Sequence, residues 1–148
     1  MINRICKLGF SLLIAVAASA QSPKAGMVSP LAQIKFESGK GCLASATENG
    51  DPATGPSTLI LKAPPNCKVP WHYHTAEEQL IVTQGTVQAE MDGMPASKLE
   101  SGGFAMMPSK VKHRFSCESK NECIMFVTFD RKYDVVWLKD DPAGAPAQ

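Results

Sequence analysis

The sequence has no marked excess of charge of either sign. Its 148 residues include 15 lysines and arginines and 14 aspartates and glutamates, which gives a formal net charge of +1. Proteins that hold nucleic acid or an anionic membrane surface by electrostatic attraction need clustered positive charge. The composition therefore gives no electrostatic case for either kind of partner.

The sequence also lacks an apolar run of the roughly 20 residues that a membrane-spanning helix needs. The apolar run near the N-terminus extends only from Leu8 to Ala18, follows the basic residues Arg4 and Lys7, and ends in the small residues 18–20. This pattern predicts a secretory signal peptide over residues 1–20. The mature chain would then be secreted or periplasmic, without membrane contact after cleavage.

No stretch has a convincing helical period, so we expect an all-β protein. Gly and Pro turns separate short strand-like segments, and the domain is expected over residues 33–139, with flexible segments at 21–32 and 140–148. The predicted strands are Gln33–Glu37, Thr58–Lys62, Glu78–Thr83, Val87–Met91, Phe104–Met107, His113–Cys117, Cys123–Phe129 and Tyr133–Leu138.

Four cysteines would remain after removal of the signal peptide, because Cys6 precedes the cleavage site. Export permits oxidation, and four cysteines allow three pairings. Cys117 and Cys123 flank a short polar segment and would face each other across a hairpin, so we predict that pair, with Cys42–Cys67 by default. The alternative is that these cysteines are buried free thiols.

Histidine is scarce, and its placement is informative. The chain has three histidines, His72, His74 and His113, and Glu78 follows the first two. Alternate residues of a strand share a face, so His72 and His74 point the same way, while His113 shares its face with Phe115 and Cys117. Glu78 shares parity with the apolar residues 80 and 82, whereas its neighbour Glu77 has the opposite parity and is the lesser candidate. Four buried polar groups of this kind need a compensating cation.

The spacing of these residues resembles the two motifs of the cupin superfamily. His72, His74, Glu78 and Gly85 fit the first motif, and Gly102, Pro108 and His113 match the second in spacing. Three positions depart from the pattern: Asn66 and Lys110 replace glycines, and Cys117 replaces asparagine. A turn with positive φ would strain Lys110 where glycine would not.

The resemblance implies a double-stranded β-helix, a jelly-roll barrel, with a metal bound by His72, His74, Glu78 and His113. The ligand set suits a divalent transition metal, namely Fe, Mn, Ni, Zn or Cu. Because cupins host many chemistries, two functions stay open: a metal-dependent, dioxygenase-like enzyme acting on a small organic molecule, or a non-catalytic module that binds a small molecule or metal. The resemblance also implies a homodimer.

Few other residues are suited to catalysis. Tyr73 is expected to face away from the flanking histidines, Tyr133 to pack as an ordinary aromatic, and Trp71 to edge the barrel mouth. Some members of a set rich in methionine and phenylalanine should line the barrel and favour an apolar ligand. That set is Phe104, Met106, Met107, Phe115, Met125, Phe126 and Phe129.

Overall fold

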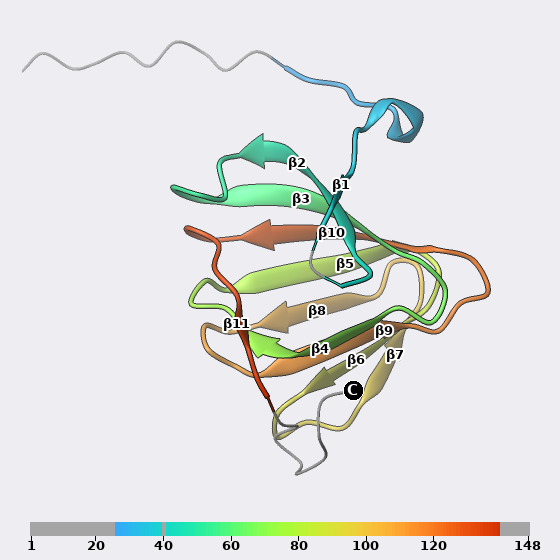
Figure 1. Cartoon of the computed structure of the whole chain (residues 1–148), viewed down its shortest axis with the longest axis vertical. Helices are drawn as coiled ribbons and strands as arrows, with labels where there is room; N and C mark the ends of the chain where they lie inside the picture. Colours follow the sequence, from blue (N-terminus) through green and yellow to red (C-terminus); the bar gives the residue numbers. More distant parts are fainter. Residues whose placement is uncertain (1–25, 40, 140–148) are drawn as a thin grey trace, which may run out of the picture.

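The computed structural model describes residues 26–39 and 41–139, which form two antiparallel sheets (Figure 1). The signal peptide predicted at 1–20 and the tail predicted at 140–148 lie outside the described residues. The elements are η1 (Leu31–Gln33), β1 (Glu37–Ser38), β2 (Ala44–Gly50), β3 (Ser57–Ala63), β4 (Lys68–Tyr73), β5 (Glu78–Gln84), β6 (Val87–Met91), β7 (Ser97–Leu99), β8 (Phe104–Met107), β9 (His113–Cys117), β10 (Cys123–Phe129) and β11 (Val136–Trp137).

The two sheets give the jelly-roll arrangement that the resemblance to cupins implies. One sheet has six strands in the order β1-β2-β3-β10-β5-β8, and the other has five in the order β11-β4-β9-β6-β7. Figure 1 shows β2, β3, β10, β5 and β8 lying side by side, with β4, β9, β6 and β7 beyond them. The predicted all-β fold class is confirmed. Across the described range, no helix is long and apolar enough to cross a membrane.

Alternation of side chains builds the core between the sheets. In β5, Leu80 and Val82 are buried while the residues between them are exposed, and in β10 Met125, Val127 and Phe129 are buried on the same pattern. Such alternation is expected where one face of an antiparallel sheet meets the core and the other meets solvent. Leu80, Val82 and Val127 are each at most 1% exposed, so this interior excludes water.

Several strand predictions need correction. The strand predicted at Gln33–Glu37 is wrong, because Gln33 ends a short 3-10 helix and β1 begins at Glu37. The strand predicted at Tyr133–Leu138 contracts to the two residues of β11. Strands β2, β4 and β7 were not predicted, because β2 is largely polar, β4 contains a proline and β7 has only three residues.

An irregularity in β4 allows two of its residues, Val69 and His72, to face the core together. Val69 pairs with Phe115, and His72 pairs with His113, so three steps along β4 correspond to two along β9. The extra residue reverses which face the following side chains occupy. Val69 and His72 therefore both face the interior, although their spacing in an unbroken strand would put them on opposite faces.

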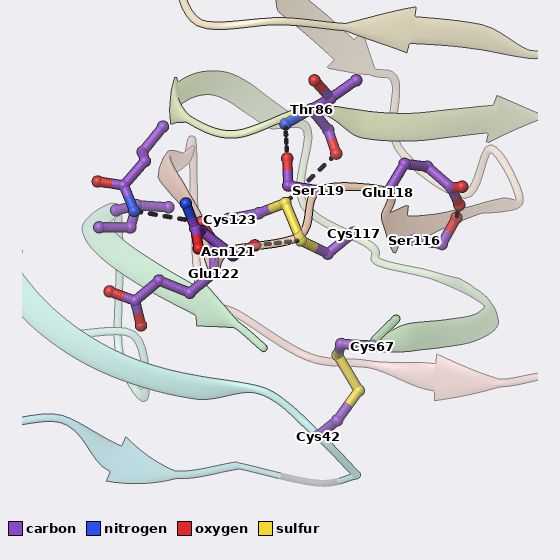
Figure 2. The surroundings of a disulfide bond; sticks show 12 residues. Cys42, Cys67, Thr86, Ser116, Cys117, Glu118, Ser119, Asn121, Glu122 and Cys123 are labelled. Atoms are coloured by element: carbon purple, nitrogen blue, oxygen red, sulfur yellow. Dashed lines mark hydrogen bonds between the residues drawn. A yellow bond between two sulfur atoms is a disulfide. The ribbon is translucent and has the colours of Figure 1, made fainter. Parts of the chain in front are cut away.

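The cysteines lie in the two predicted pairs. The Sγ atoms of Cys42 and Cys67 are 1.92 Å apart, and those of Cys117 and Cys123 are 2.04 Å apart, both within disulfide distance (Figure 2). The second pair joins the end of β9 to the start of β10, which lie in different sheets, so this pair links the two sheets and the hairpin predicted between these cysteines does not form. Gly85 lies against it, because a Cβ there would approach Cys123 Sγ to 2.9 Å. Disulfide formation in the exported protein stays a prediction.

The two residues that replace motif glycines both adopt the left-handed conformation that glycine favours. Asn66 has φ 61° and Lys110 has φ 65°. The cost is about 1–2 kcal/mol for an ordinary residue and less for asparagine, whose short side chain tolerates this region. The turn at Lys110 also supports the site, because the Lys110 amide donates a 2.7 Å hydrogen bond to the His74 carbonyl.

We predict that Lys110→Gly raises the free energy of unfolding by about 0.5–1 kcal/mol. The substitution relieves the left-handed strain and loses part of that gain through the greater freedom of glycine in the unfolded chain. Lys112→Gly, two residues on at a position without positive φ, is the matched control and should lower stability. Urea unfolding of both variants measures the difference, and equal losses in both would contradict the strain at Lys110.

Candidate metal centre

Four buried side chains from three strands and one loop converge on a single point. His72 comes from β4, His74 follows that strand, Glu78 begins β5 and His113 begins β9. Each offers one ligand atom, and these atoms all lie within 4.8 Å of one another. All four residues are at most 5% exposed. The structure thus brings together the whole set that the sequence predicts as metal ligands.

Backbone carbonyls hold the three imidazoles in one tautomer. The Nδ1 atom of His72 lies 2.7 Å from the Pro70 carbonyl oxygen, that of His113 lies 2.9 Å from the Val111 carbonyl oxygen, and that of His74 contacts the Asp134 carbonyl oxygen. A carbonyl oxygen only accepts, so each Nδ1 must carry the proton. Each Nε2 is then left without a proton and can offer its lone pair to a metal ion. In metal-binding histidines, a hydrogen bond from the other ring nitrogen commonly fixes the tautomer in this way.

Glu78 lies between two of these nitrogens. Its Oε2 atom is 3.0 Å from His74 Nε2 and 3.2 Å from His113 Nε2. Both Glu78 Oε2 and His113 Nε2 are fully enclosed, yet neither has an aligned hydrogen-bond partner. Buried polar atoms without partners are costly. A divalent cation between these atoms would satisfy them, so the residues present fit a metal ion.

The electrostatics of the cluster separate its members. Burial, reinforced by His113, lowers the pKa of His72 to about 4. Burial opposes the charged form of His74 too, but Glu78 and the Asp134 carbonyl outweigh it and raise the pKa of His74. For Glu78, burial works against ionisation, yet the imidazoles of His113 and His74 lower its pKa to about 2. Glu78 is therefore a carboxylate, and His74 holds a proton more readily than His72.

Asp134 supports the site without touching its centre, and the sequence gives no signal for it. Its carboxylate accepts hydrogen bonds from the Thr75 amide at 2.7 Å and the Thr75 hydroxyl at 3.0 Å. Its backbone carbonyl accepts a hydrogen bond from His74 Nδ1. One residue of the segment before β11 thus fixes both the loop that follows His74 and the orientation of the His74 ring.

Other residues weighed from the sequence lie elsewhere. Glu77 Oε1 accepts a 2.9 Å hydrogen bond from Gln79 on the outer side. The Tyr133 ring packs 5.2 Å from His74 and 4.8 Å from Phe129, and burial, with the charge of Glu78, raises its pKa to about 12. The expectation that Trp71 edges the barrel mouth is not met, because Trp71 is 5% exposed with the Arg114 guanidinium 5.0 Å from its ring.

A pocket of about 250 Å³ lies beside the centre on the side of β6, β7 and β8, and of the four candidate ligands His113 is part of its wall. Of the predicted apolar set, Phe104, Met106, Met107 and Phe115 line it. Met125 and Phe129 pack in the core instead, and Phe126 lies 38% exposed on the outer face of the six-stranded sheet.

Residues 59–129 match the family model described as a cupin domain. Among curated proteins, none matches the chain in sequence. The polyketide cyclase RemF from Streptomyces resistomycificus is similar in structure, with TM-score 0.64 and 20% identity, over 78% of this chain and 90% of that one.

Two further solved structures share the fold. An oxalate oxidase in complex with the substrate analogue glycolate has TM-score 0.61 and 18% identity over 76% of this chain. A chain from crystal structures of the DMSP lyases RdDddP and RnDddQII has TM-score 0.62 and 14% identity over 72% of this chain. Each match spans 63% of the other chain, less than two thirds of its length.

We predict that the protein binds one Mn²⁺ or Zn²⁺ per chain and that His74→Ala abolishes stoichiometric binding without loss of β structure. Removing one imidazole takes away a ligand but leaves the core strands packed. Glu77→Gln is the matched control, because Glu77 faces outward beside Glu78. Elemental analysis and circular dichroism measure the two effects, and a full equivalent of metal on His74→Ala would contradict the assignment.

The same protein should bind metal more weakly as the pH falls. Metal binding requires unprotonated Nε2 atoms, and a proton competes with the metal for His74, whose pKa is raised above 6.5. The loss should therefore begin above pH 6.5. Calorimetric titration between pH 8 and pH 5 checks this onset, and an affinity independent of pH over that range would contradict it.

Proposed function

Because the chain belongs to the cupin superfamily, we propose that it is an exported metal-binding cupin that acts as a metal-dependent enzyme on a small organic molecule. One observation carries the proposal. Three imidazoles, each fixed by a carbonyl at Nδ1, aim their free nitrogens at one point beside the Glu78 carboxylate, and His113 also forms part of the wall of a pocket. The signal-like N-terminus and the cysteine pairs support export.

We propose that the four residues hold a divalent transition metal, with iron or manganese ahead of Ni, Zn or Cu. Four protein ligands leave free positions on a six-coordinate ion but fill a tetrahedral zinc. The bound ion would supply Lewis acidity or oxygen activation, and a dioxygenase-like reaction is one form of that chemistry. Solved structures with this fold include a lyase, an oxidase and a cyclase, so the fold alone selects none of these reactions.

The chain's own residues have limited but definite roles in this proposal. Glu78 supplies the negative charge that balances the ion, and the three imidazoles fix its position. The apolar residues of the interior exclude water, which strengthens electrostatic interactions at the centre. Tyr133, with its pKa raised to about 12, stays a neutral phenol beside His74. In the residues that the structure describes, no histidine lies outside the cluster to serve as a separate base.

A second function is favoured by that shortage of acids and bases. The same centre and pocket suit a non-catalytic module that binds a small molecule, or that carries the metal itself. In this case the ion would anchor the ligand, and no proton transfer would be needed. Turnover separates the two functions.

We further propose that the protein forms a homodimer through the outer face of its six-stranded sheet. Phe126 pairs with both Ile60 and Ile81, and Ile81 pairs with Phe104, so four apolar side chains cross four strands in one row. Ile81, Phe104 and Phe126 are 42%, 54% and 38% exposed. Such a row marks an interaction site, and a two-fold axis would place it against its own copy.

We predict turnover of a small, largely apolar substrate by the metal-loaded protein and a loss of at least about tenfold in Glu78→Gln, with some metal retained. The imidazoles dominate retention, whereas the sole carboxylate sets the charge at the ion. Product analysis of a substrate screen under air and under nitrogen distinguishes oxygen-dependent from Lewis-acid chemistry. Glu77→Gln serves as the control, and ligands that bind but are never transformed under either gas would establish the binding module.

We predict that Phe126→Glu yields a monomer, because two carboxylates would meet across the proposed two-fold axis. Gln88→Glu places the same charge on the outer face of the other sheet and should leave the dimer intact. Light scattering after size exclusion gives the mass of each variant. A monomeric unmodified protein at high concentration, or equal dissociation of both variants, would count against this face.

A further inference from the structure

Methionine is concentrated on one wall of the molecule. Of the seven methionines in the chain, Met91, Met94, Met106 and Met107 all line the pocket of about 250 Å³ described above. The pocket lies where β6 and β7 of one sheet approach β8 of the other, so residues from both sheets form its walls. Unbranched thioether side chains adapt their shape to apolar partners more readily than branched ones.

Two of these methionines stand next to the candidate metal ligands. Met91 is the register partner of His113 across β6 and β9, and Met107 is the partner of Glu78 across β8 and β5. Directly opposed side chains on one sheet face have Cβ atoms about 4.5–5.5 Å apart. Met91 and Met107 therefore line the part of the pocket that lies next to the candidate ligands.

The other two methionines lie at the solvent end. Met94, in the turn after β6, is 62% exposed, and Met106 on the edge strand β8 is 42% exposed. Leu99 and Phe115 are further apolar residues of the wall. The pocket thus joins solvent to His113 through an almost wholly apolar passage.

The passage offers little to a charged ligand. Apart from His113, Glu90 is the single ionisable residue of its wall, and Arg114 neutralises it with two hydrogen bonds of 2.9 and 2.8 Å. Ser97 contributes the one hydroxyl. A sugar or a dicarboxylate would have to shed its water here without finding enough donors or acceptors in return, which is costly.

We propose that this methionine-lined pocket is the substrate passage of the centre and that it selects substrates with an uncharged, apolar body of one or two rings, presenting their reacting group to the metal. A volume of 250 Å³ corresponds to about eight water molecules, which fits a body of that size. The proposal rests on the proposed function, because it assigns the substrate class of the same site.

Methionine-methyl NMR tests the proposal without turnover. The full chain, loaded with diamagnetic Zn²⁺ and labelled with ¹³C at its methionine methyls, is titrated with benzyl alcohol, xylose and malonate. Benzyl alcohol should shift the signals of the four pocket methionines saturably and leave those of Met27 and Met125 in place. Xylose and malonate should move none of the pocket signals. Larger shifts with the sugar or the dicarboxylate, or none with benzyl alcohol, would overturn the substrate class.

A matched pair of variants separates the pocket from general surface effects. Met106→Gln makes the partly exposed mouth polar at nearly constant size and should weaken benzyl alcohol binding roughly fourfold, the factor for losing about one buried methylene of apolar contact. Met27→Gln changes a methionine that is 64% exposed and far along the chain from the pocket, and should not alter binding. Equal effects of the two substitutions would contradict the passage.

Replacement of Zn²⁺ by paramagnetic Mn²⁺ tests the link to the centre. The proton signals of bound benzyl alcohol and the methyls of Met91 and Met107 should broaden, whereas the methyl of Met27 should not. If benzyl alcohol shifts the methyl signals of the pocket methionines but its own proton signals do not broaden with Mn²⁺, it binds at an apolar site separate from the centre. That result would overturn the passage. Because both readouts are independent of catalysis, a protein that binds the probe in this way but turns nothing over would refute the enzyme and retain the passage.

Discussion

The structure depends on providing polar partners for three imidazoles and one carboxylate in an interior that excludes water. An unpaired charge or polar atom there costs several kcal/mol, so each of the four groups needs a fixed partner. Backbone carbonyls take one nitrogen of each ring, and the remaining nitrogens and Glu78 Oε2 face one another. Of these atoms, Glu78 Oε2 and His113 Nε2 are buried without an aligned hydrogen bond, which leaves a cation as the group that would complete them.

Alternation of side chains allowed much of this centre to be predicted. His113 shares a face with apolar residues of its strand, and Glu78 with those of β5, so both could be placed inside from the sequence. His72 is a different case. The irregularity in β4 determines on which side of the sheet His72 lies, and the residue pattern gives no sign of that irregularity. Asp134 was missed because its contacts with His74 and Thr75 span about 60 residues of sequence.

Asn66 and Lys110 show that these two turns keep a left-handed backbone conformation even where a residue other than glycine must adopt it. Lys110 keeps a φ of 65° despite its side chain. The conformation persists because the surroundings fix it: the Lys110 amide bonds to the His74 carbonyl, and the Ser109 hydroxyl bonds to the Thr75 carbonyl at 2.7 Å. Strain of this size survives only where neighbouring contacts over-determine the backbone. Here those contacts connect the turn to His74 and Thr75, and His74 is one of the four candidate metal ligands.

The two ends of the interior divide its tasks. Toward β11, the Asp134 carbonyl oxygen and the Tyr133 ring hold His74 in place. Toward β7 and β8, the strand partners of His113 and Glu78 are Met91 and Met107, whose side chains are unbranched and adaptable. One side of the centre is therefore fixed and the other can conform to a ligand. The pocket at β6, β7 and β8 lies on this adaptable side, so a ligand held there would meet side chains that can adjust to its shape.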